Sequence, residues 1–68
     1  MWNGDDDRNA RVLVGHAYEL AVSGGPQDLR LAQRAIGRAI QYFMASGMTR
    51  QQAITRVIAI AEMLGALE

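Results

Sequence analysis

Few side chains in this sequence are of types that could do acid–base or metal chemistry. His16 and Glu19 are three residues apart, which in a helix would place them on one face, about one turn apart. Such a pair could act as a base and its partner, or as two metal ligands. An isolated pair of this kind is most often simply solvated, and the sequence has no cysteine to complete a zinc site. We therefore expect no catalytic site, no metal and no cofactor.

The run Asp5-Asp6-Asp7 concentrates negative charge near the N-terminus. It lacks the spaced oxygen ligands and the glycine of a calcium-binding loop. Carboxylates at the start of a helix stabilise its exposed amides and its dipole. We interpret residues 1–7 as an acidic N-terminal tail that caps a helix beginning near Arg8. The role of this tail and of Trp2 stays open.

A row of arginines is the strongest candidate for recognition by charge. Arg30, Arg34 and Arg38 recur every four residues and would form a ridge about 12 Å long on the outer face of one helix, where Gln41 would extend it. Guanidinium groups make forked contacts with phosphates and carboxylates, so the ridge could bind an acidic protein surface. The alternative is an ordinary solvated face, which is the more frequent outcome for a stripe of charge.

The elements that must position these residues are predicted to be three helices in one domain, residues 8–68. The chain has 68 residues, half of them hydrophobic, and equal numbers of acidic and basic residues. Ser23-Gly24-Gly25-Pro26 should end one helix and start the next, which runs to Ser46. We find no apolar signal core and no stretch long enough to cross a membrane, so we expect a cytoplasmic protein.

Both of these helices have an apolar face at 3.6-residue spacing. The predicted stripe of the first helix is Ala10, Leu13, Val14, Ala17, Leu20 and Ala21, and that of the second is Leu29, Ala32, Ile36, Ala39, Ile40 and Phe43. The second stripe, flanked by Leu31, Ala35, Tyr42 and Met44, is wider than one partner helix needs. Gly37 interrupts this helix at a cost of roughly 1 kcal/mol, which close approach of another backbone would explain.

The third helix follows a short turn. Gly47 supplies a left-handed stop, Met48 folds back on the preceding helix, and Thr49 with Gln52 has the spacing of a capping box. So short a connection predicts that the last two helices form an antiparallel hairpin. The third helix should start at Thr49 or Arg50 and run to about Ala66.

The third helix changes character halfway along. Its predicted inward stripe is Ile54, Val57, Ile58, Ala61 and Leu64. The opposite side is polar in the first half, but in the second half it becomes Ala59, Ile60, Met63 and Leu67. A helix that is apolar all round is normally buried on every side, which a three-helix monomer cannot provide. We therefore predict that these four residues form a self-association surface, and that the chain dimerises into a larger helical bundle. The alternative is that the first helix or Trp2 covers them.

The segment Gly47-Met48-Thr49-Arg50-Gln51-Gln52-Ala53-Ile54-Thr55-Arg56-Val57-Ile58 resembles the second half of the helix-turn-helix signature of bacterial transcription regulators. The resemblance covers about a fifth of the chain. It implies that Arg50, Gln51, Gln52 and Thr55 would contact DNA bases. Phe43 and Ser46 depart from the pattern, and zero net charge favours the alternative of a well-capped hairpin turn.

These features predict a small all-α protein that is not an enzyme. The first expectation is a regulator, either an adaptor or an inhibitor, that binds another protein as a homodimer, with the Arg30–Arg38 ridge facing an acidic partner. The alternative is a DNA-binding regulator that uses the start of the third helix. The sequence does not identify the target or indicate whether binding inhibits or activates it.

Overall fold

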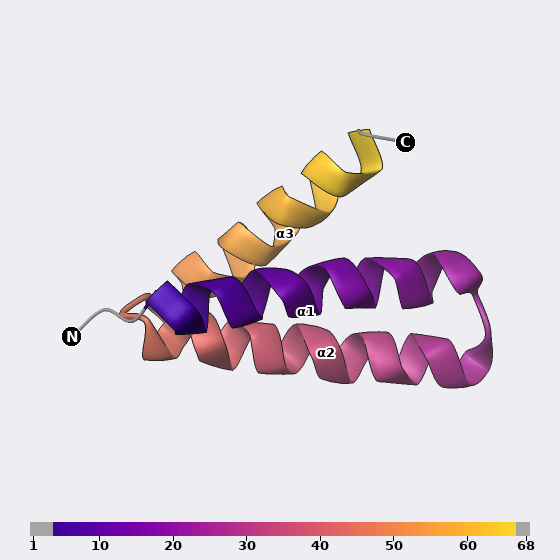
Figure 1. Ribbon diagram of the computed structural model, residues 1–68, viewed down its shortest axis with the longest axis horizontal. Coiled ribbons are helices and arrows are strands. Elements are labelled where there is room, and N and C mark those ends of the chain that lie inside the picture. Colours follow the sequence, from indigo (N-terminus) through magenta and orange to yellow (C-terminus); the bar gives the residue numbers. More distant parts are fainter. Residues whose placement is uncertain (1–3, 67–68) are drawn as a thin grey trace.

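The computed structural model describes residues 4–66, and all of their regular secondary structure is helical (Figure 1). The three helices are α1 (Gly4–Ser23), α2 (Pro26–Ala45) and α3 (Arg50–Ala66). The prediction of an all-α, three-helix fold is therefore confirmed. Helices α1 and α2 lie side by side and antiparallel, whereas α3 leaves the end of α2 and diverges from both (Figure 1).

Helix α1 begins about a turn earlier than we predicted. It starts at Gly4 rather than near Arg8, so the three aspartates form its first turn instead of preceding it. Acidic side chains are favourable at this position because they face the positive end of the helix dipole. Asp7 also pairs with Arg11 one turn along, at 2.9 Å between Oδ2 and Nε. The acidic run therefore extends the helix that we expected it only to cap.

The predicted stop and start signals between helices are confirmed. Gly24 and Gly47 both have positive φ values, 78° and 114°, which an L side chain rarely adopts. The Thr49 amide donates to Oε1 of Gln52 at 3.0 Å, and the Gln52 amide donates to Oγ1 of Thr49 at 3.1 Å. This reciprocal pair is the predicted capping box. Met48 folds back as expected, and its amide donates to the Phe43 carbonyl.

Alanines line the seam between α1 and α2. Ala17 of α1 and Ala32 and Ala35 of α2 are buried together, and Ala10 and Ala39 are completely buried in the adjoining cluster. Short side chains let two helix axes approach closely, because the axial distance follows the side chains at the contact. This explains why α1 and α2 make most of the contacts between helices.

A second cluster joins α3 to this pair. Phe43 is fully buried at the end of α2 and packs with Val14 of α1 and with Ala53 and Val57 of α3. Phe43 and Val14 are the largest completely buried side chains among the described residues. So small a core gives a small stability margin.

The hairpin that we predicted between the last two helices is not confirmed. The antiparallel hairpin is formed one connection earlier, by α1 and α2, and α3 turns away from α2 after Gly47 (Figure 1). The turn is as short as expected, but its length does not determine the angle at which the next helix leaves. The buried ring of Phe43 lies near the end of α2, and the two residues of α3 that are buried in the same cluster, Ala53 and Val57, lie in the first half of α3.

Gly37 has no structural reason to be glycine within the described chain. It lies on the exposed face of α2, and a Cβ added there would meet nothing within 4 Å. We expect Gly37→Ala to raise the free energy of unfolding by about 0.5–1 kcal/mol, because alanine is the better helix former. Urea denaturation followed by circular dichroism would measure this. Gly47→Ala should destabilise the chain, and a loss of stability in Gly37→Ala would contradict the prediction.

Candidate binding surfaces

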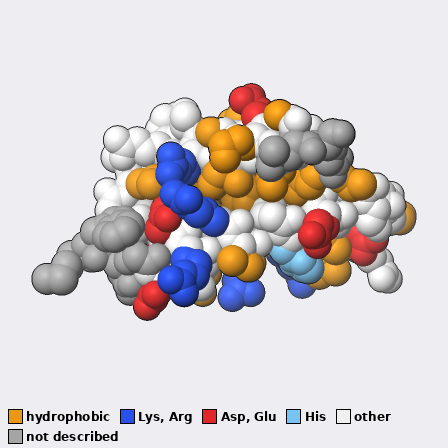
Figure 2. All heavy atoms as spheres, turned by 45° about the horizontal axis from the view of Figure 1, so that its top comes forward, with side chains coloured by type: hydrophobic (Ala, Val, Ile, Leu, Met, Phe, Trp, Pro, Cys, Tyr) orange, Lys and Arg blue, Asp and Glu red, His pale blue; other side chains and the backbone are white. Residues whose placement is uncertain are grey.

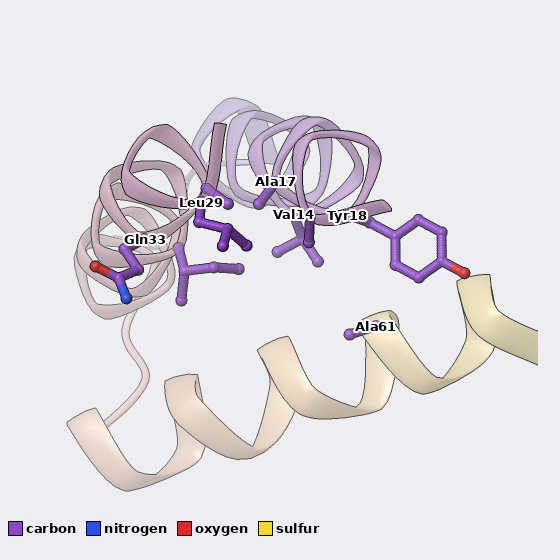
Figure 3. A pocket seen from close by; sticks show the side chains of 9 residues that line it. Val14, Ala17, Tyr18, Leu29, Gln33 and Ala61 are labelled. Atoms are coloured by element: carbon purple, nitrogen blue, oxygen red, sulfur yellow. The ribbon is translucent and has the colours of Figure 1, made fainter. Parts of the chain in front are cut away.

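The divergence of α3 leaves an apolar groove between it and the α1–α2 hairpin. The groove has a volume of about 490 Å³. Residues from all three helices line it: Val14, Ala17, Tyr18, Ala21, Leu29, Ala32, Gln33, Ile36 and Ala61. In Figure 3 the side chains of α1 and α2 point down toward α3, which contributes only the short side chain of Ala61. The groove is therefore the part of the hairpin's inner face that α3 does not cover.

Tyr18 bounds the groove on the side of α1. Its side chain reaches from α1 toward the last turns of α3 (Figure 3), and its hydroxyl oxygen would lie 3.9 Å from a Cβ at Gly65. On the side of α2, Leu29 remains 46% exposed at the edge. The polar lining groups are Tyr18 and Gln33. An apolar groove of this kind suits the apolar face of another helix.

The second half of α3 remains largely uncovered. Met63 is 65% exposed and Ala59 is exposed, whereas Ile60 is half-buried against the Phe43 cluster. Leu67, the fourth residue of the predicted self-association surface, lies outside the described residues. Figure 2 shows hydrophobic side chains gathered in a band across this side of the molecule, with charged side chains toward its edges.

The prediction that Ile58 faces inward is wrong. Its side chain is 53% exposed, while Val57, at the neighbouring position, is buried. Ile60, which we placed on the opposite side of the helix, packs against the core instead. The second half of α3 has apolar residues all round, so its sequence pattern does not determine which side is buried.

The arginine ridge lies on the surface of α2. Arg30, Arg34, Arg38 and Gln41 are all exposed, and none of the arginines forms an ion pair with a residue between 4 and 66. Successive steps of four residues rotate around a helix by about 40°. Arg30 is therefore the ridge residue nearest to the groove, about 100° round α2 from Leu29, and Arg38 lies on the opposite side of the helix, about 180° from Leu29. There Arg38 and Asp6 line the same depression.

The residues that the helix-turn-helix resemblance implicates lie at the start of α3. Arg50, Gln51, Gln52 and Thr55 are all exposed, but the side chain of Gln52 is engaged in the capping box. Gln51, Gln52 and Thr55 border a shallow depression with Met48 and Arg56. The structure therefore leaves Arg50, Gln51 and Thr55 accessible to a ligand.

The possible chemical site on α1 gains no further members. His16 and Glu19 are both exposed. Between residues 4 and 66, no three His, Cys, Asp or Glu side chains are grouped so that they could hold a metal ion. In the same part of the chain, no helix has the length and hydropathy needed to cross a membrane.

Sequence reasoning missed the groove, although one signal pointed to it. The apolar stripe of α2 is wider than a single helix can cover, and Leu29, at its N-terminal end, is left at the edge of the groove. The sequence could not show that the third helix covers only part of this stripe.

Comparison of the chain with protein-family models, with curated proteins and with solved structures found no significant match. The class of protein is therefore defined by the fold and the surfaces alone. It is a three-helix all-α protein with an apolar groove, a largely uncovered helix end and an arginine ridge.

Proposed function

We propose that this chain is a non-enzymatic regulator that binds another protein through its helical surfaces and acts as a homodimer. The observation that carries the proposal is the amount of apolar surface left uncovered. Leu29, Ile58 and Met63 are each between 46% and 65% exposed, and they lie on two of the three helices. Apolar surface of this kind on a small protein indicates an interaction site.

In this proposal, the arginine ridge is the surface that binds the target protein. Arg34 and Arg38, with Gln41, lie on the part of α2 that turns away from the groove, so they remain accessible when the groove is covered. Exposed guanidinium groups without a described ion-pair partner favour an acidic protein surface, where each can bind a carboxylate through two hydrogen bonds.

A pull-down from cell lysate with the Arg34→Glu variant tests this proposal. We expect the wild-type chain to retain a specific protein and Arg34→Glu to lose most of it, because the substitution places negative charge opposite acidic side chains. Arg8→Glu changes another exposed arginine, on α1, and is the matched control that should retain the protein. Equal recovery by wild type and Arg34→Glu would contradict the role of the ridge. Light scattering at micromolar concentration tests the homodimer separately.

Binding to DNA is the second candidate function. The accessible Arg50, Gln51 and Thr55 at the start of α3 favour it, because this is where a recognition helix meets base edges. Balanced net charge and the engaged side chain of Gln52 place it second. If the chain does not bind duplex DNA at low salt, this alternative is excluded. Binding that weakens in Arg50→Ala would support it.

A further inference from the structure

The groove and the exposed flank of α3 carry complementary features. On α2, Leu29 and Gln33 line the groove, and the exposed side chain of Arg30 lies on the next face of the helix, beyond Gln33 and away from α1. On α3, exposed Ile58 lies one helical turn before the exposed carboxylate of Glu62. Each surface therefore combines apolar side chains with one charge at the border, and the two charges are opposite.

Neither charge is neutralised within the described chain. Between residues 4 and 66, neither Arg30 nor Glu62 forms an ion pair. Helix α3 lines its own groove with Ala61, and neither Ile58 nor Glu62 is among the lining residues, so both exposed side chains are available to another copy. Every copy of the chain has both the groove and the α3 flank. In a two-fold dimer, the α3 flank of each copy can therefore pack into the groove of the other.

We propose that the groove is the docking site for α3 of a second copy of this chain. In the dimer, the flank that carries Ile58 covers Leu29 and Ile36 of the partner copy, and Glu62 faces Arg30 across the rim. The short side chain of Ala61 leaves room for the two α3 helices to approach each other. This inference rests on the homodimer of the proposed function. It places the dimer interface in the groove and not at the side of α3 that carries Met63.

Two leucines on α2 give a matched test. Leu29 borders the groove and Leu31 lies on another face of the same helix, and their exposures are nearly equal at 46% and 47%. We expect Leu29→Glu and Ile58→Glu each to raise the dimer dissociation constant by about 30-fold or more, as expected for the centre of an interface. Leu31→Glu, which lies outside the groove lining, should change it much less. Sedimentation equilibrium measures the constant, and far-UV circular dichroism confirms that each variant is folded.

A charge reversal tests the register of the interface. Arg30→Glu and Glu62→Arg should each weaken the dimer, because each places like charges opposite each other across the rim. The double variant should recover most of the lost affinity. Both residues are exposed, so these substitutions leave the core intact. A double variant weaker than either single one would overturn the pairing of Glu62 with Arg30.

The outcomes separate this inference from the proposed function. Equal weakening by Leu29→Glu and Leu31→Glu would overturn docking in the groove. A dimer that is insensitive to Leu29→Glu but disrupted by Met63→Glu would also overturn it, while leaving the homodimer of the proposed function intact. A wild-type chain that stays at its monomer mass of 7.4 kDa at micromolar concentration would overturn both.

Discussion

Replacing Phe43 with alanine is expected to lower the free energy of unfolding by about 3–5 kcal/mol. Phe43 is completely buried, and its ring belongs to the cluster that joins all three helices, together with residues such as Val14 and Val57. The loss combines the transfer free energy of the ring with the cavity it leaves. A small domain has a total stability of a similar size, so a large fraction of the variant should be unfolded.

The neighbouring Met44 provides the control for this prediction. It is 42% exposed on α2, so Met44→Ala should change the free energy of unfolding by less than about 1 kcal/mol. Urea denaturation followed by circular dichroism compares the two variants with the wild type. If Phe43→Ala were as stable as Met44→Ala, the ring would not be the centre of the core that the structure indicates.

Enlarging the seam between α1 and α2 should have the second largest effect. Ala39 is completely buried where the two helices pack, so Ala39→Leu forces them apart or into strained rotamers. We expect a loss of about 1–3 kcal/mol, the usual cost of adding methylene groups to a packed core. Thermal and urea denaturation would both report it.

Ala45→Leu is the matched substitution outside the seam. Ala45 is the last residue of α2 and is exposed, so the added side chain has open space and little effect on stability is expected. If Ala45→Leu lowered the free energy of unfolding as much as Ala39→Leu, the larger side chain would destabilise α2 itself and would not act by separating α1 from α2. The proposed dimer also depends on this seam, because α1 and α2 together form the floor of the groove.

The sequence predicted the local features of this fold well. The breaks at Gly24 and Gly47 and the capping box of Thr49 and Gln52 all lie where the residue types placed them. These features depend on the backbone preferences of one residue or on hydrogen bonds within one turn, so neighbouring residues determine them. The start of α1 was missed, because aspartate is favourable both before a helix and inside its first turn.

What the sequence by itself determined is therefore the number of helices, their ends near the two turns, and the excess of apolar surface over what three helices can bury. Only the tertiary structure decided where that excess lies. The direction of α3 depends on packing around Phe43, and its rotation depends on which apolar side meets the core, as exposed Ile58 and half-buried Ile60 show. Helical periodicity identifies a buried side only where a polar side opposes it, and the second half of α3 has almost none.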